Sequence, residues 1–364
     1  MRPLNKIFMR KRLTSLVLFV LVLLTLAVIA QKPAYPEIKQ LQSPQNPRLG
    51  FMIHGGAGVI TRGSMTPERE KEYRNKLTEA LLAGYKMLQN GRSSLDAVET
   101  AIRILEDSPL FNAGKGAVFT AEGKNELDAS IMNGKTLAAG AVAGLNRVKN
   151  PITLARAVME CSPHVMMSGV GAQKFASEQK IELVEEKYFW TQHRWDALQQ
   201  ILKEEKVKSA DPAKKVGWAE AEKPANRFGT VGAVALDTNG DLAAGTSTGG
   251  MTNKKYGRIG DAPIIGAGTY ADNNSCAVSA TGWGEFFIRL GVARDISAMM
   301  EYRALTVQAA ADRVIKQKLQ KLGGDGGIIA IDKFGNMAIS FNSEGMYRAY
   351  INVDGKPVVE IYND

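Results

Sequence analysis

The sequence predicts an α+β fold in which antiparallel sheets pack against each other and helices cover the outside. Two pairs of short apolar runs, joined by the turns 237–240 and 332–335, have the pattern of β-hairpins. Segments at about 66–106 and 284–322 have helical periodicity. Hairpins combined with paired helices are typical of layered proteins. The chain has 364 residues, 45% hydrophobic and 23% charged, enough for one large domain or two ordinary ones.

Two capped helices dominate the first half. Thr66 and Pro67 form a cap and first turn, and Ser93 with Asp96 forms a capping box. The elements expected here are a strand at 49–53, helices at about 66–90 and 93–106, strands at 128–132 and 138–145, and a helix at about 150–160.

The second half begins with a change of composition. Lys, Glu, Gln, Asp and Ala dominate residues 181–228, so we expect residues 181–229 to be a mobile linker. Order resumes at Thr230. The elements expected beyond it are a hairpin with strands at 231–236 and 241–245, helices at about 284–302 and 305–322, and a hairpin with strands at 328–331 and 336–340.

The N-terminus predicts export. Residues 1–12 carry five cations and no acid, and the apolar run 13–30 ends with the small residues Val28 and Ala30. A basic start, an apolar stretch and a small-residue exit form a signal peptide over 1–30, for a periplasmic or secreted protein. The alternative is an uncleaved membrane anchor. Loss of residues 1–30 lowers the net charge from +9 to +4, which gives no reason to expect nucleic acid.

Several chemistries lack the residues they need. His54, His164 and His193 are scattered and no zinc spacing exists, which argues against metal catalysis. Ser247 stands in a G-T-S-T-G motif like that of an esterase. That reading fails because no histidine follows His193, whereas the α/β-hydrolase order places the histidine last.

Thr230 is the best candidate nucleophile. Gly229 precedes it without a Cβ that would hinder attack of the threonine hydroxyl on the glycine carbonyl. If that attack cuts the chain, Thr230 becomes an N-terminus, and its α-amine, with an unperturbed pKa of roughly 7.7–8.0, can act as the base. The sequence thus predicts self-cleavage between Gly229 and Thr230.

Motifs from about Phe51 to the C-terminus carry a family resemblance. They read I-H-G-G-A-G, P-L-F-N-A-G-K-G-A-V-F-T, S-P-H-V-M-M, G-T-V-G-A-V-A-L-D, T-S-T-G-G-M-T-N-K, G-R-I-G-D-A-P-I-I-G-A-G, T-G-x-G-E and N-S-E-G-M-Y-R-A. The sequence resembles the isoaspartyl peptidase/L-asparaginase family, the plant-type asparaginases of the N-terminal-nucleophile hydrolases.

The resemblance implies an αββα sandwich, made as a single-chain precursor and cleaved into α and β chains that assemble as (αβ)2. Here the signal peptide is 1–30, an extended leader 31–48, the α subunit 49–229 and the β subunit 230–364, with 49–364 as one catalytic domain. The implied substrates are β-aspartyl dipeptides and L-asparagine. No catalytic cofactor is implied, and no membrane contact once the signal is removed.

The resemblance also assigns roles to individual residues. Thr230 matches the nucleophile and Thr248 a second threonine hydrogen-bonded near it. Arg258 and Asp261 match the pair that binds the substrate's α-carboxylate and α-amine, which is sound chemistry for a guanidinium fork and a carboxylate. The remaining matches are Thr281 and Gly282 as oxyanion donors, Gly284 in the binding site, and Asn112 and Gly56 as support for the nucleophile.

A structural sodium ion is implied as well. Its ligands would be backbone carbonyls of a loop, and the matching residues are Leu105, Glu106, Ser108, Phe111, Ala113 and Lys115. Lys115 departs from the apolar residue usual there, and an ammonium beside the ion would compete with it. Trp283 also departs from smaller residues, and we expect it to reshape the leaving-group side.

Two other functions are compatible with parts of the sequence. Glycosylasparaginase shares the fold, but there the nucleophile typically follows Asp and the donor motif reads T-G-D-G-D, whereas here Gly229 precedes Thr230 and the motif is T-G-W-G-E. An uncleaved protein that only holds amino acids through Arg258 and Asp261 is the rival from another class. It predicts an intact chain and no turnover.

Overall fold

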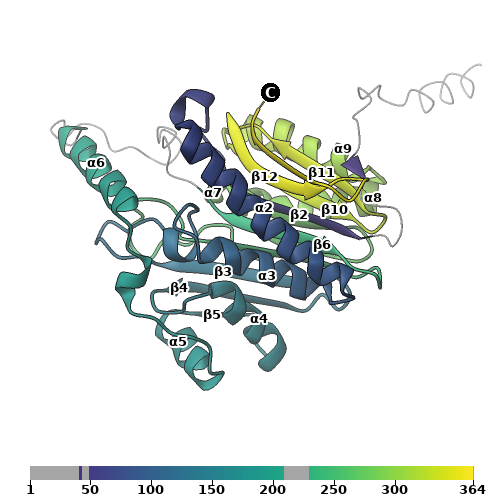
Figure 1. Cartoon of the computed structure of the whole chain (residues 1–364), viewed down its shortest axis with the longest axis horizontal. Coiled ribbons are helices and arrows are strands. Elements are labelled where there is room, and N and C mark those ends of the chain that lie inside the picture. Colours follow the sequence, from purple (N-terminus) through teal and green to yellow (C-terminus); the bar gives the residue numbers. More distant parts are fainter. Residues whose placement is uncertain (1–40, 43–48, 209–228, 364) are drawn as a thin grey trace, which may run out of the picture. The chain divides into compact units, whose positions relative to one another are not determined.

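Two sheets form the centre of the molecule (Figure 1). The computed structural model describes residues 41–42, 49–208 and 229–363, and all statements here concern that part of the chain. The larger sheet has the strand order β13-β12-β2-β6-β7-β3-β4-β5, and the smaller has the order β1-β11-β10-β9-β8. Neighbouring strands are antiparallel except for the pair β4 and β5.

The bounds in the larger sheet are β2 Gly50–Gly58, β3 Leu127–Asn133, β4 Ala139–Leu145, β5 Met166–Ser168, β6 Val231–Leu236, β7 Leu242–Thr248, β12 Gly345–Ile351 and β13 Pro357–Tyr362. Those in the smaller are β1 Leu41–Gln42, β8 Thr269–Ala271, β9 Cys276–Gly282, β10 Gly326–Asp332 and β11 Asn336–Phe341.

The apolar side chains of β6 show why the sheets stack. Successive strand residues point to opposite faces. Val231, Ala233 and Ala235 join the core between the larger sheet and its helices. Val234 and Leu236 join a second core shared with residues of the smaller sheet such as Ile329. A strand buried on both faces needs a layer on each side, so the larger sheet lies between helices and the smaller sheet.

Helices cover the outer face of each sheet. The larger sheet carries α2 (Pro67–Gln89), α3 (Ser94–Glu106) and α4 (Pro151–Cys161), and α5 (Gly169–Glu178) adjoins β4. In Figure 1, α2 and α3 lie across this face. The smaller sheet is covered by α7 (Gly284–Leu290), α8 (Val292–Arg303) and α9 (Val307–Asp312). The order is helix, sheet, sheet, helix, so the predicted αββα sandwich is confirmed.

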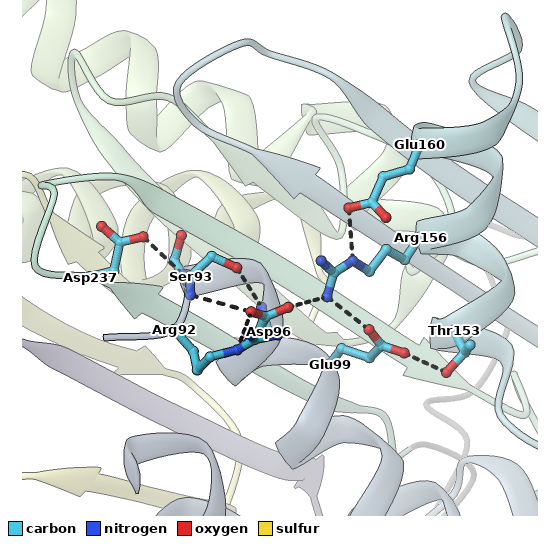
Figure 2. Close-up of polar contacts among 9 residues, drawn as sticks. Arg92, Ser93, Asp96, Glu99, Thr153, Arg156, Glu160 and Asp237 are labelled. Carbon is cyan, nitrogen blue, oxygen red and sulfur yellow. Dashed lines mark hydrogen bonds and ion pairs between the residues drawn. The ribbon is translucent and has the colours of Figure 1, made fainter. Parts of the chain in front are cut away.

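The predicted helix starts in the first layer are confirmed. The Thr66 side chain accepts a hydrogen bond from the Arg69 amide. Ser93 and Asp96 form the capping box. Figure 2 shows how Asp96 also reaches the neighbouring helix: Arg156 of α4 donates to its carboxylate at 2.8 Å and to Glu99 at 3.0 Å. These partly buried contacts fix α3 against α4.

In the second helical layer two predictions need correction. The helix expected over 284–302 is broken at Gly291, whose φ of 59° ends α7 and begins α8. The helix expected over 305–322 has a π-helical stretch, Arg313–Leu319, between α9 and α10 (Gln320–Leu322). A residue in the left-handed region cannot continue a helix, and glycine adopts it most readily.

The prediction of a mobile linker over 181–229 is wrong for its first part. Helix α6 spans Gln192–Lys208 after a short 3-10 turn at Glu186–Phe189. Its polar composition hides the helix, but Gln, Lys, Glu, Leu and Ala are strong helix formers. Leu198 is buried, and the Trp195 ring packs edge-on against Phe119. Residues 209–228 lie outside the described residues.

The N-terminal signal predicted at 1–30, and nearly all of the leader at 31–48, also lie outside the described residues. Within the part that the structure describes, no helix combines the length and apolar character that a membrane crossing needs.

Candidate active site

Thr230 lies directly before β6, in the middle of the larger sheet between β2 and β7. It is 7% exposed. The pairing of Val231 with Ser247 places Thr230 beside Thr248, the last residue of β7. The Thr230 Oγ1 donates to Thr248 Oγ1 over 3.1 Å. The structure therefore brings together the two threonines that the sequence singled out.

The Gly229 carbonyl is held by two donors. Asn112 Nδ2 donates to its oxygen at 2.8 Å and Thr248 Oγ1 at 3.1 Å. Thr248 Oγ1 also accepts from the Gly250 amide at 3.0 Å. A hydroxyl has one donor and two acceptor sites. Because its donor points at Gly229 and the Gly250 amide fills one acceptor site, the other is left for the Thr230 proton.

Asn112 is fixed in this orientation by its other contacts. Its Oδ1 accepts from the Val118 amide at 2.9 Å, and its Nδ2 donates to the Gly250 carbonyl at 2.7 Å as well as to Gly229. The side chain is buried. A reversed amide would set oxygen against two carbonyls, so the donor faces the Gly229 oxygen.

Gly56 packs against the peptide that joins Gly229 and Thr230. Its φ is +113°, a conformation that side chains rarely adopt. A Cβ on Gly56 would lie 2.9 Å from the Gly229 Cα and 3.2 Å from the Thr230 nitrogen. Only glycine lets the two backbones approach this closely.

His54 takes part in the site, which sequence reasoning missed. Its Nδ1 lies 3.0 Å from the Thr230 carbonyl oxygen, and its Nε2 lies 2.9 Å from Ser279 Oγ. A carbonyl can only accept, so Nδ1 carries the proton, and in a neutral ring Nε2 can then only accept. The Ser279 hydroxyl also lies 3.0 Å from the Gly245 carbonyl oxygen. Burial lowers the pKa of His54 to about 3, against a smaller opposing effect of the Thr230 contact. The ring is a neutral positioning group, and the signal was its place directly before Gly55-Gly56.

Arg258, Asp261 and Gly284 converge, as the sequence predicted. A Cβ on Gly284 would lie 2.9 Å from both Arg258 Nη2 and Asp261 Oδ1. The Asp261 Oδ2 is buried and has no hydrogen-bond partner within the described chain. Burial, opposed by Arg258, raises the pKa of Asp261 to about 7. An open carboxylate oxygen beside a guanidinium suits an amino acid's ammonium and carboxylate.

Glu285 forms an ion pair with the Arg258 guanidinium. Arg258 donates from Nε to Oε1 at 2.8 Å and from Nη2 to Oε2 at 2.7 Å, a two-pronged ion pair. Sequence reasoning gave Glu285 no role, although it ends the T-G-x-G-E motif. This pair fixes the plane of the guanidinium.

Thr281 and Gly282 end β9 beside the 54–58 segment. Thr281 Oγ1 accepts from the Ala57 amide at 3.3 Å. A Cβ on Gly282, whose φ is +151°, would lie 2.4 Å from the Asp325 carbonyl. Gly282 lines the same cavity as Gly229, and the role of the two residues as oxyanion donors stays a prediction.

The predicted sodium loop follows the end of α3. The Ala113 carbonyl accepts one amide hydrogen bond, from Gly116, and so keeps a second lone pair. The Leu105 carbonyl accepts from the amides of both Asp107 and Ser108. The Lys115 ammonium lies over the Tyr188 ring, 5.4 Å from its centroid. Its charge thus has an aromatic partner. The remaining loop members Ser108, Phe111 and the Glu106 backbone lie in the same buried turn. No cluster of three or more His, Cys, Asp or Glu side chains capable of holding a metal occurs in the described ranges.

Ser247 lies as expected, whereas Trp283 does not. Ser247 is buried and donates to Glu106 Oε1 at 2.6 Å, so it is no nucleophile. Trp283 packs edge-on against Phe286 at 4.8 Å, within the core under α7 and α8. It does not line the cavity beside the scissile peptide. The expectation that Trp283 reshapes the leaving-group side finds no support in this placement.

A threonine directly before a central strand of a stacked sheet pair, hydrogen-bonded to a second threonine that holds the preceding carbonyl, is the arrangement of the N-terminal-nucleophile hydrolases. The chain matches the asparaginase family over residues 48–361 and belongs to that family.

Three relatives illustrate the similarity. Isoaspartyl peptidase of Escherichia coli K12 is 51% identical over 312 residues, 86% of this chain and 95% of the relative. Plant-type L-asparaginase of Pyrococcus abyssi is 43% identical over 304 residues, 83% and 96% of the two chains. Isoaspartyl peptidase/L-asparaginase of the mouse is 41% identical over 298 residues, 82% and 86%.

Proposed function

We propose that this chain is a β-aspartyl peptidase with L-asparaginase activity, matured by cutting itself between Gly229 and Thr230. The observation that carries the proposal is the set of contacts joining Thr230 Oγ1, Thr248 Oγ1 and the Gly229 oxygen. The names of the relatives, isoaspartyl peptidase and L-asparaginase, support the choice of reaction.

Self-cleavage follows from the precursor geometry. Thr230 Oγ1 passes its proton toward Thr248 and attacks the Gly229 carbonyl carbon. The Asn112 and Thr248 donors stabilise the oxyanion that forms on the Gly229 oxygen. The C–N bond breaks, the nitrogen takes a proton and an ester remains on the Thr230 oxygen. Water hydrolyses the ester, leaving a carboxylate on Gly229 and a free amine on Thr230.

Turnover reuses the same hydroxyl. The Thr230 amine takes the hydroxyl proton as the oxygen attacks the side-chain carbonyl of an aspartyl group. The leaving nitrogen takes that proton and departs as ammonia or an amine. Thr281 and Gly282 are the proposed donors to the oxyanion. Water then opens the β-aspartyl ester, and the sequence of steps uses no cofactor.

The aspartyl head is proposed to bind at Arg258 and Asp261. The guanidinium of Arg258 takes the α-carboxylate, and the open Oδ2 of Asp261 accepts from the α-ammonium. Gly284 leaves room between them, since a Cβ there would touch both.

The carbonyls of the 105–115 loop are hard oxygen ligands, which suit a sodium ion. The Ala113 carbonyl keeps a lone pair for it. Such an ion would fix the loop that carries Asn112. Export through residues 1–30 and assembly as (αβ)2 are further parts of the proposal, and both rest on the sequence and the resemblance.

Mass spectrometry of the purified protein tests the proposal. We expect a fragment that begins at Thr230, together with ammonia release from L-asparagine and leucine release from β-Asp-Leu. Thr230→Ala should give one folded, uncut and inactive chain. Thr238→Ala, at an exposed turn, is the matched control and should mature normally. An intact wild-type chain without turnover would favour the binding-protein rival, and selective hydrolysis of glycosylated asparagine would favour glycosylasparaginase.

A further inference from the structure

A large cavity adjoins the scissile peptide on one side. Its volume is about 770 Å³, within the range of small-molecule sites. Gly56, Gly229 and Gly282 line its inner end. Arg258 and Asp261, which are proposed to hold the aspartyl head, do not line it. A substrate held by those two residues across Thr230 must therefore send its leaving group into this cavity.

The cavity wall carries the cation Arg194, together with His193 and Asp325. Arg194 of α6 donates from Nε to the Gly116 carbonyl at 2.9 Å, which fixes the plane of its guanidinium. No carboxylate within the described residues pairs with it, although it is half-buried. The nearby Arg69 differs, because it is paired with Glu72 at 2.9 Å. The two terminal nitrogens of Arg194 remain as a fork that matches a carboxylate.

Part of the cavity wall is aromatic. Tyr73 and Tyr347 stack with their ring centroids 4.4 Å apart, and both line the cavity. Phe111 meets Tyr73 edge-on at 5.4 Å. Covering such a surface with an apolar side chain is favourable, because it removes apolar area from water. The cavity thus offers one partner for a carboxylate and another for an apolar group.

We infer that this cavity is the leaving-group subsite, in which Arg194 binds the free α-carboxylate of the second residue of a β-aspartyl dipeptide and the tyrosine pair receives its side chain. Ammonia, released from L-asparagine, uses neither feature. The inference rests on the proposed function and names its preferred substrate class: β-aspartyl dipeptides with an apolar C-terminal residue.

Three substrates test the inference in the mature, self-cleaved enzyme: β-Asp-Leu, its C-terminal carboxamide and L-asparagine. We expect the carboxamide to have a KM about tenfold higher than β-Asp-Leu in the wild type, as for a lost charge-assisted contact. Arg194→Gln should raise the KM for β-Asp-Leu about tenfold with little change in kcat. It should change the KM of the carboxamide less than twofold, because that substrate no longer has the partner charge.

Arg303→Gln, an exposed arginine at the end of α8, is the control and should leave the preference among the three substrates unchanged. Equal KM values for acid and amide in the wild type would overturn the inference whatever the variant does. An equal loss for all three substrates in Arg194→Gln would also overturn it. An uncut chain without turnover would overturn the proposed function itself, and the inference with it.

Discussion

The hydroxyl of Thr230 lies 3.1 Å from that of Thr248, which in turn donates to the carbonyl of Gly229, the residue directly before Thr230. One side chain therefore accepts the nucleophile's proton and polarises its target. This double contact explains why a threonine 18 positions away has to end the neighbouring strand.

Removing that hydroxyl should slow maturation. Thr248→Val keeps the shape but removes the donor, and we expect self-cleavage to be slower by about 10²–10³-fold, as for loss of one oxyanion donor. Thr248→Ser retains the hydroxyl and should stay within about tenfold of wild type. The fraction of cut chain against time on a denaturing gel measures both. Equal cleavage of the valine and serine variants would contradict the role.

Gly56→Ala should hold the protein in its precursor form. The new methyl group would overlap the Gly229 Cα at 2.9 Å and needs a φ of +113°. The peptide must then move away from Asn112 and Thr248, so cleavage slows. Gly63→Ala is the matched control, since a Cβ there meets nothing within 4 Å. Intact-mass measurement after purification compares the two, and normal maturation of Gly56→Ala would count against this geometry.

Binding of the aspartyl head should depend on pH through Asp261. Burial raises the pKa of this carboxyl from 3.8 to about 7, with Arg258 opposing the shift. Only the ionised form attracts an ammonium, so the inhibition constant of the product L-aspartate should fall as pH rises from 6 to 8. Asp261→Asn should bind L-aspartate more weakly, with a flatter pH dependence. A wild-type constant that is unchanged across this range would refute the assignment.

The free energy of unfolding should fall as pH rises, because of Glu106. Its side chain is fully buried, and burial raises its pKa from 4.5 to about 8 despite hydrogen bonds from Ser247 and Ile152. The folded state therefore holds the proton more tightly than the unfolded chain. The resulting stability is present below pH 4.5 and is lost as pH rises toward 8.

Thermal unfolding tests the Glu106 prediction. Glu106→Gln carries no proton to lose, so its Tm should decline less between pH 5 and 8 than that of the wild type. Other buried carboxyls, including Asp128, have raised pKa values too, so the informative quantity is the difference between the two proteins. Parallel Tm curves would show that Glu106 does not titrate in this way.

Local signals in the sequence predicted much of the fold. Caps such as Thr66 and Ser93 act over three or four residues and gave the starts of α2 and α3. Helix α6 was missed because its stability comes from contacts with distant residues, such as Trp195 on Phe119. The break at Gly291 was missed because a single glycine inside an apolar pattern fits either a helix or a turn.

The site also contains residues that sequence motifs predicted and residues that they did not. Thr230 and Thr248 were found from motifs, and their pairing follows from a hairpin of adjacent strands. The contact of His54 with Thr230 joins residues 176 positions apart, and no spacing rule reports it. The ion pair between Glu285 and Arg258 could not be predicted from sequence either, because it depends on how α7 is oriented relative to Arg258.

The strand order has a consequence for the refolding of the mature enzyme. Strands β6 and β7, which follow the predicted cut, lie between β2 and β3, which precede it. Once cut, neither piece contains a contiguous half of the sheet. The precursor can refold as one molecule, but the mature protein, once fully unfolded, must find its other piece in solution. Its refolding becomes second order in concentration, and a single unfolding event in dilute solution is close to irreversible.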